Sequence, residues 1–156
     1  NVMKAGPLAG EPCSEIKVFL TDAGLHEDNI HRGPAHVVPA VAQAIKGAMR
    51  QAKPTLLEPL QILRIDVPEE MLGNVMTLVQ NRRGQVLDTT VDQGVAAVKT
   101  KIPVAETFGM EAALKSNTEG KGFYSLIEVI YEKIPDDIKD GVIEKIRQRK
   151  GLTENQ

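Results

Sequence analysis

Residues 56–86 read LLEPLQILRIDVPEEMLGNVMTLVQNRRGQV, and this stretch decides the fold of the larger part of the chain. It opens with a strongly apolar strand that Pro68 closes. Glu69 and Glu70 then stand where acidic groups favour the positive start of a helix, and apolar residues at helical spacing follow them. Arg82-Arg83-Gly84 suits the end of that helix. The stretch therefore predicts a strand, a helix and the start of a second strand.

The residues that follow extend this pattern into a complete small domain. Residues 85–91 and 95–104 predict two antiparallel strands joined by a hairpin turn near Asp92 and Gly94. A short helix over about 106–115 and a last strand over 120–134 complete the order βαββαβ. This is the split βαβ, ferredoxin-like arrangement, an antiparallel sheet with two helices on one face. A terminal helix is expected from Asp136 to about Arg149.

The residues before position 56 predict a smaller unit with a different order. Residues 6–12 are rich in Gly and Pro and predict an irregular loop, and residues 16–21 alternate in polarity as a strand with one buried face does. The polar stretch TDAGLHEDNIHRGP, residues 21–34, predicts an exposed loop. A helix should follow and stop at Lys53, because Pro54 disfavours helical geometry in the residue before it. The whole chain is thus expected to be α+β.

Composition excludes several classes of protein. The length of 156 residues and the 42% share of hydrophobic residues suit one ordinary domain or two small ones. The chain has 19 Lys and Arg and 21 Asp and Glu, for a net charge of −2, so neither half is expected to be a basic surface that binds polyanions. The lone Cys13 excludes an internal disulfide and a Cys-based zinc site. No apolar run approaches the roughly 18 residues of a membrane span. We expect an intracellular, cytoplasmic protein without a membrane partner, and the first residue, Asn1, leads us to expect a longer parent chain.

The loop between the expected strand and the expected helix is the strongest candidate for function. Its last residues stand just ahead of a helix N-terminus, where free N–H groups favour an anion, and Arg32 adds a cation suited to RNA phosphate. The alternative is a solvated turn whose Asp and Asn side chains cap the helix. His26, Glu27, Asp28 and His31 have metal-ligand chemistry, but the HExxH zinc motif is absent, and we expect no metal. His36 is expected in the first helical turn, where it supports packing or donates a hydrogen bond.

The remaining motifs point away from catalysis. The sequence contains neither a GxSxG elbow nor a GxxxxGK[ST] phosphate loop, so hydrolysis of nucleotides by the P-loop route is not expected. Lys121-Gly122-Phe123-Tyr124 begins like an RNA-recognition-motif signature but lacks its later small and aromatic residues and falls on the fourth strand instead of the third. For Arg82 and Arg83, contact with phosphate and interaction with the helix dipole remain equal alternatives.

Six segments together resemble one protein family. They are GPLAGEP at residues 6–12, LHEDNIHRG at 25–33, LEPL at 57–60, RRGQV at 82–86, PVAETFG at 103–109 and RQRKGL at 147–152. In this order they resemble the C-terminal part of archaeal and eukaryotic translation elongation factor 2, the ribosomal translocase, which is related to bacterial elongation factor G. His36 stands where members of this family commonly have Gln, and Tyr131 lies in a segment that often carries Trp.

The resemblance implies a domain organisation and a role. Residues 1–54 would be the C-terminal portion of domain IV, a partial strand-loop-helix unit of the βαβ, ribosomal-protein-like type. Residues 55–135 would be the ferredoxin-like domain V, and residues 136–156 a C-terminal helix and tail. The parent factor would be a translational GTPase that promotes translocation of tRNA and mRNA, whereas this chain would be a noncatalytic part. GTP and Mg²⁺ would belong to a G domain outside this sequence.

The resemblance also assigns site residues and partners. His31 would be the histidine that is modified to diphthamide by the diphthamide-synthesis enzymes. The tip residues that would contact ribosomal RNA near the decoding region, where tRNA and mRNA lie, are His26, Glu27, Asp28, Asn29, Ile30, Arg32 and Gly33. Arg82 and Arg83 would contact ribosomal RNA in the factor-binding region of the large subunit. The chain would have no catalytic residue, no metal, no cofactor of its own and no DNA partner. The alternative function is a stand-alone ferredoxin-like RNA-binding module.

Overall fold

A computed structural model describes residues 2–152 and divides them into two compact units. One unit is the continuous segment Leu57–Lys133. The other joins the residues before Leu57 to the residues after Lys133. The terminal helix therefore groups with the N-terminal part of the chain, and each unit is described separately below.

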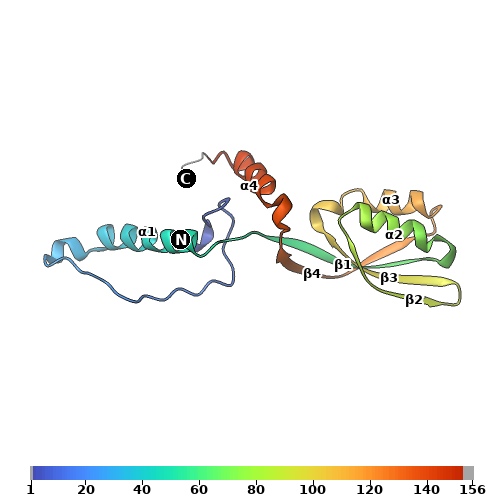
Figure 1. The fold of residues 1–156 in the computed structure, drawn as a ribbon, viewed down its shortest axis with the longest axis horizontal. Helices are drawn as coiled ribbons and strands as arrows, with labels where there is room; N and C mark the ends of the chain where they lie inside the picture. The colour runs from blue at the N-terminus through green and yellow to red at the C-terminus, as the bar shows by residue number, and fades with distance from the viewer. Residues whose placement is uncertain (1, 153–156) are drawn as a thin grey trace. The chain divides into compact units, whose positions relative to one another are not determined.

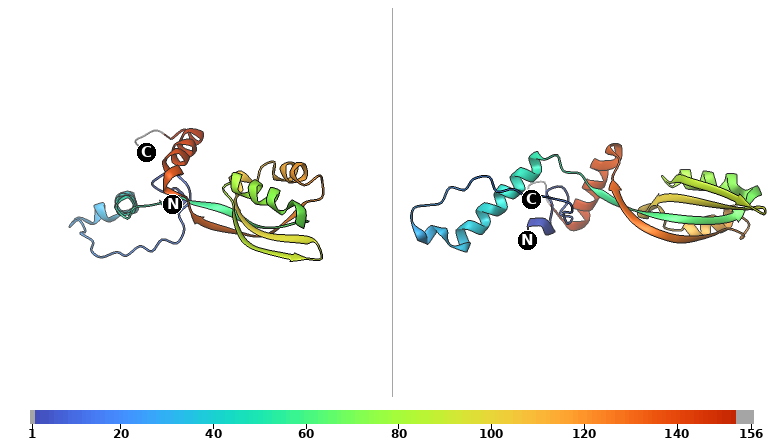
Figure 2. Two further views of the ribbon diagram at one scale, coloured as in Figure 1. Left: turned by 45° about the vertical axis from the view of Figure 1, so that its right-hand side comes forward. Right: turned by 90° about the horizontal axis from the view of Figure 1, so that it is seen from below.

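The Leu57–Lys133 unit is a four-stranded antiparallel sheet with two helices on one face (Figure 1). The elements are β1 (Leu57–Pro68), α2 (Leu72–Asn81), β2 (Gln85–Asp92), β3 (Val95–Pro103), α3 (Met110–Asn117) and β4 (Phe123–Lys133). The strands lie in the order β2-β3-β1-β4, and β1 pairs antiparallel with both β3 and β4. Figure 2 shows the β2–β3 hairpin and β4 beside β1. The predicted α+β class and the βαββαβ order are confirmed.

The core of this unit lies between the sheet and the two helices. The central strands β1 and β3 place alternate side chains on the helix-covered face, which is the period expected of a strand with one buried face. Buried residues of both strands and both helices meet there: Leu63, Ile65, Val67, Val75, Leu78, Val79, Ala96, Val98, Ile102, Met110 and Leu114. On β1, Arg64 is exposed and pairs with Asp66 at 2.9 Å, and this hydrogen bond to a carboxylate raises the pKa of Arg64.

Glycines and short 3-10 turns set the ends of these elements. The β2–β3 turn has positive φ at both Gln93 (48°) and Gly94 (78°), as a two-residue hairpin turn requires. The helix expected over about 106–115 begins later than predicted. A 3-10 turn at Val104–Glu106 and a left-handed Gly109 (φ 69°) precede it, so α3 runs from Met110 to Asn117.

The second unit is built on helices and irregular chain. It contains 3-10 turns at Val2–Lys4 and Asn29–Arg32, the helix α1 (Pro34–Gln51) and the helix α4 (Asp136–Lys150). Both helices were predicted and are confirmed, although α1 ends at Gln51, two residues before the predicted end at Lys53. The strand expected over residues 16–21 is not formed, because a strand needs a pairing partner and the described residues of this unit contain no other strand. Its apolar side chains, including Phe19 at 71% exposure, lie open to solvent. No helix among residues 2–152 is both long and apolar enough to cross a membrane.

Candidate nucleic-acid interface

The loop identified in the sequence is an exposed turn at the N-terminal end of α1 (Figure 1). We call residues 26–33 the tip loop. The 3-10 turn Asn29–Arg32 forms its far side, and Asp28 caps this turn by accepting the N–H of Ile30 on its side chain at 3.0 Å. The carbonyl of Asp28 accepts the N–H of His31 at 3.2 Å. Asp28 therefore caps the 3-10 turn, whereas α1 itself begins at Pro34, and its N-cap residue Gly33 provides no side-chain cap.

Arg32 holds the tip loop closed from within. Its Nε donates to the carbonyl of His26, and its Nη2 donates to the carbonyl of Glu27 at 3.1 Å. These bonds connect the two ends of a seven-residue turn through one planar guanidinium group. The phosphate contact expected of Arg32 stays a prediction, and the structure adds a second role, because part of the guanidinium is already engaged with the loop backbone.

All three histidines of the chain meet at the tip loop. The ring centroid of His31 lies 4.6 Å from that of His26 and 5.1 Å from that of His36, and both contacts are edge-to-face. The Nδ1 atom of His26 accepts the N–H of Asp28 at 3.0 Å, so the proton of its neutral ring is on Nε2. No group of three His, Cys, Asp or Glu side chains within residues 2–152 is arranged to hold a metal ion. The cluster is therefore a row of rings without metal-site geometry.

The other tip residues expected to contact RNA are exposed, except for the half-buried Gly33. Ile30 leaves 75% of its surface exposed, which is unusual for an isoleucine and suits a contact surface. Asn29 begins the 3-10 turn, and Glu27 contributes its carbonyl to the Arg32 contact. The carbonyl of Gly33 accepts the N–H of His36 at 3.0 Å, which begins the hydrogen bonding of α1. His36 thus lies in the first helical turn, as predicted.

Arg82 and Arg83 belong to the Leu57–Lys133 unit and are engaged within it. Arg82 donates through Nη1 to the carbonyls of Glu106 and Phe108 and through Nη2 to that of Gly109. It thereby ties the end of α2 to the turn before α3. Arg83 pairs with Glu58 at 2.7 Å, and its side chain is 34% exposed. Sequence reasoning missed the Arg82 contact. Every residue has a backbone carbonyl that can accept a hydrogen bond, so the choice of these acceptors leaves no signal in the sequence.

Gly84, which follows these arginines, is required by packing. A Cβ atom built at Gly84 would lie 2.7 Å from Cγ1 of Val79, 2.8 Å from the carbonyl oxygen of Val79 and 2.9 Å from Cγ1 of Ile102. Its N–H also donates to the carbonyl of Val79 at 2.9 Å. The presence of a glycine in the RRGQV segment is thus explained by the close packing where the chain passes from α2 into β2.

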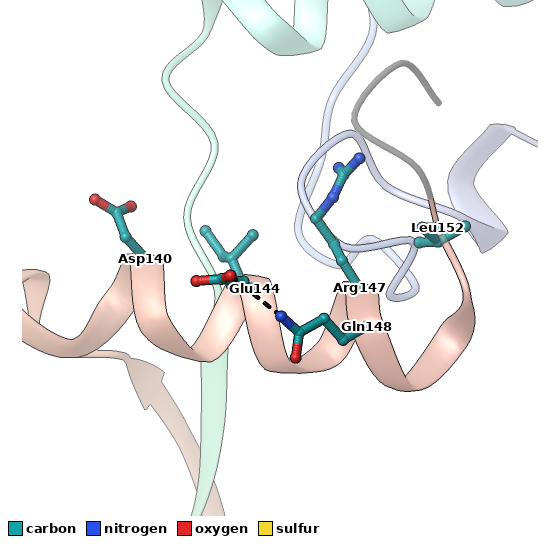
Figure 3. Close-up of a pocket in the computed structure, with 6 residues that line it drawn as sticks. Asp140, Glu144, Arg147, Gln148 and Leu152 are labelled. Carbon is teal, nitrogen blue, oxygen red and sulfur yellow. Dashed lines mark hydrogen bonds between the residues drawn. The ribbon is translucent and has the colours of Figure 1, made fainter.

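The first and last recognised segments of the chain contact one another. Arg147 and Lys150 of α4 donate to the carbonyls of Leu8 (3.0 Å) and Gly10 (2.8 Å), and Lys150 also pairs with Glu11 at 2.8 Å. We call residues 6–12 the N-terminal loop. Figure 3 shows Arg147 extending from α4 toward this loop, beside a pocket that Asp140, Ile143, Glu144, Gln148 and Leu152 also line. These contacts give the basic end of α4 a structural role.

Comparison with known proteins agrees with the geometry of both units. The family model described as "Elongation factor G C-terminus" matches residues 55–142, and "Elongation factor G, domain IV" matches residues 1–53. Elongation factor 2 of Nanoarchaeum equitans is 47% identical over 97% of this chain and 20% of its own length. Elongation factor 2 of Methanocaldococcus jannaschii is also 47% identical, over 97% and 21%. A crystal structure of a Thermus thermophilus protein superposes with a TM-score of 0.77 at 29% identity and covers 94% of this chain and 22% of that one. The chain thus spans about a fifth of the length of these relatives.

Proposed function

Because the chain belongs to the family of elongation factor G and elongation factor 2, we propose that it supplies the ribosome-contacting C-terminal part of a translocation factor. In this proposal residues 1–54 are the later part of domain IV, residues 55–135 are domain V, and residues 136–156 are the terminal helix and tail. The whole factor is a cytoplasmic translational GTPase that moves tRNA and mRNA through the ribosome. This part positions RNA and performs no chemistry.

The tip loop is the observation that carries the proposal. It projects polar groups from a turn that its own Asp28 cap and Arg32 contacts hold in shape. A turn that is already ordered loses little conformational entropy on binding, so its donors can meet phosphates and bases at low cost. Imidazole, guanidinium and amide donors are the groups that proteins use to contact RNA backbones and unpaired bases. The tip loop is accordingly the part proposed to enter the decoding region.

His31 is proposed as the acceptor of diphthamide, with the diphthamide-synthesis enzymes as transient partners. Its ring lies at the centre of the row of three imidazoles, on the exposed 3-10 turn. A modifying enzyme can reach a side chain on such a turn without unfolding either helix of this unit. The modification would enlarge the surface that the tip loop offers to RNA.

The Leu57–Lys133 unit is proposed to face the factor-binding region of the large subunit. Arg83 keeps about a third of its side chain exposed and can share its charge between Glu58 and an RNA phosphate. Arg82 contributes mainly by holding the turn at residues 106–109 in place. Any direct contact of Arg82 with phosphate would have to use N–H groups that do not already donate to the carbonyls of residues 106, 108 and 109.

The residues of this chain do not fit GTP with Mg²⁺. The sequence lacks a phosphate loop, and within residues 2–152 no set of three carboxylate, imidazole or thiol groups is arranged around a common cation position. We therefore assign nucleotide and metal to the G domain of the whole factor. No step of the proposed role depends on either within this chain.

A chimeric factor tests the proposal. The matching segment of Methanocaldococcus jannaschii elongation factor 2 would be replaced by this chain, and single-codon movement on archaeal ribosomes would be followed by toeprinting. We expect the chimera to translocate, and a control chimera with residues 26–32 replaced by Gly and Ser to hydrolyse GTP but translocate slowly. A chimera that binds ribosomes and hydrolyses GTP yet never moves mRNA would contradict the proposal.

The rival function, a stand-alone RNA-binding module, makes a different prediction. Such a module would bind free RNA with an affinity that falls steeply as salt rises, because basic side chains displace counterions from phosphates. The net charge of −2 and the internal engagement of Arg32, Arg82 and Arg83 speak against strong binding to free RNA. Filter binding across a salt series separates the two functions.

A further inference from the structure

The turn that Arg82 holds carries one large exposed side chain. This turn, residues 104–109, leads from β3 into α3 (Figure 1). Its Phe108 leaves 79% of its surface exposed. Between Val95 and Phe123, all of which the structure describes, no other large hydrophobic side chain is exposed. Burial in the core therefore does not explain a phenylalanine at this position, because hydrophobic stabilisation follows the apolar area that is removed from water.

The backbone of the turn is held in place although the ring is exposed. Arg82 donates to the carbonyl of Phe108 at 2.9 Å and to two further carbonyls of the same turn. The hydroxyl of Thr107 donates to the carbonyl of Val104 at 2.8 Å, and the carbonyl of Thr107 accepts the N–H of Met110 at 3.0 Å. A partner that binds the ring therefore has little loop entropy to remove.

Phe108 differs from the other two phenylalanines of the chain because its ring has no partner. Lys17 lies over the ring of Phe19 at 4.9 Å, and Lys115 lies over the ring of Phe123 at 3.6 Å. Within residues 2–152, no cation and no second ring contacts the ring of Phe108. The ring is thus available to a flat partner from outside the chain.

We propose that Phe108 is a stacking platform for an unpaired base of ribosomal RNA. This inference rests on the proposed function of the Leu57–Lys133 unit, which faces the large subunit. Proteins bind unpaired bases by stacking them on exposed aromatic rings and bind the adjoining phosphates with basic side chains. Arg83 supplies the basic group, since its guanidinium lies 3.9 Å from the carboxylate of Glu106 in the same turn and its side chain is 34% exposed.

The surroundings of the ring favour a base over an apolar pocket of a partner protein. An aromatic side chain at the centre of a protein–protein contact is surrounded by further contacts that exclude water. Because Glu58 and Glu106 offset the charge of Arg83, the turn attracts free RNA weakly, and stacking carries the contact. The other exposed residues between positions 104 and 113 are small or charged: Ala105, Gly109, Glu111 and Ala112.

Substitutions at position 108 test the inference in the chimeric factor described above. Phe108→Tyr and Phe108→Trp keep a flat ring, Phe108→Leu keeps an apolar side chain without a ring, and Phe108→Ala removes both. Binding to archaeal ribosomes would be measured with a non-hydrolysable GTP analogue. We expect the Ala and Leu variants to bind about five- to a hundredfold more weakly, the loss that removal of one stacked base causes, and the Tyr and Trp variants to bind within about twofold of the unchanged chimera.

Two controls separate the contact from effects on folding. Phe123→Ala removes another exposed phenylalanine (63%) from the same unit, and we expect ribosome binding to stay within about twofold. Urea unfolding of the 156-residue chain should give the same midpoint for every variant at position 108, because an exposed side chain adds little to stability.

A photoreactive benzoyl group on the ring at position 108 identifies the partner directly. Irradiation of the complex between chimera and ribosome should crosslink this ring to RNA of the large subunit. A crosslink to ribosomal protein alone, or a Leu variant that binds as well as the unchanged chimera, would overturn the stacking role and indicate an apolar pocket.

The outcomes also separate this inference from the function on which it rests. If every variant at position 108 binds ribosomes and translocates like the unchanged chimera, the stacking role is wrong and the proposed function stands. If the unchanged chimera itself does not bind ribosomes, both are wrong.

Discussion

Two buried threonines of the Leu57–Lys133 unit predict opposite effects of the same substitution. Both Thr100 and Thr118 are 0% exposed. The hydroxyl of Thr118 donates to the carbonyl of Leu114 at 2.7 Å and accepts the N–H of Gly122 at 2.8 Å, which joins the end of α3 to the start of β4. The hydroxyl of Thr100 on β3 has no hydrogen-bond partner among the residues that the structure describes.

Replacement by valine keeps the shape and removes the hydroxyl. Thr118→Val loses two hydrogen bonds and leaves the buried N–H of Gly122 unsatisfied, so the free energy of unfolding should fall by about 2–4 kcal/mol. Thr100→Val removes a polar group whose burial nothing offsets, and the free energy of unfolding should rise by about 1 kcal/mol. The difference between the two variants isolates hydrogen bonding from side-chain volume.

Urea unfolding followed by tyrosine fluorescence measures both effects. The chain has no Trp and two Tyr, Tyr124 and Tyr131, and both lie in β4, so the signal reports this unit alone. The slope with urea should stay constant while the midpoint shifts in opposite directions. Equal destabilisation by both substitutions, or no effect of Thr118→Val, would refute the reasoning.

Four further substitutions test other parts of the structure. Gly84→Ala should lower the free energy of unfolding by about 1–3 kcal/mol in the same urea assay, because its Cβ overlaps the carbonyl of residue 79, whereas Gly73→Ala, which has open space in α2, should raise it by up to about 1 kcal/mol; a neutral Gly84→Ala would contradict the packing. Arg32→Ala should increase the fast backbone motion of the tip loop in ¹⁵N relaxation and change global stability by less than about 0.5 kcal/mol; an equally rigid loop would show that the contacts of Arg32 are dispensable. Lys150→Gln should speed amide exchange in the N-terminal loop while leaving β1 unchanged, and unaltered exchange there would contradict the role of α4.

The ferredoxin-like unit was predictable because its signals are local. The period of two in β1 and β3, the acidic start and apolar stripe of α2, and the turn at Gln93 and Gly94 each act within a few residues. Local signals failed at residues 16–21, where a correct alternating pattern has no strand to pair with among the described residues. They also misplaced the start of α3, since the left-handed Gly109 and the contacts of Arg82 decide it together.

The candidate site, too, was predictable from the sequence only in part. The sequence singled out the tip loop and placed His36 in the first turn of α1, because polar turn residues before a helix form a recognisable pattern. It did not reveal that Arg32 holds the loop closed or that the three imidazoles form a row, because both depend on how the loop turns back on itself.

The sequence by itself determined the class of fold, the order βαββαβ, the family and the position of the exposed loop, because periodicity, turn chemistry and linear motifs are properties of neighbouring residues. Only the tertiary structure decided that Arg147 and Lys150 hold a loop more than a hundred residues earlier, and that Arg82 holds three carbonyls more than twenty residues ahead. Backbone carbonyls accept hydrogen bonds whatever their side chains are, so such partners are selected by proximity in the folded chain.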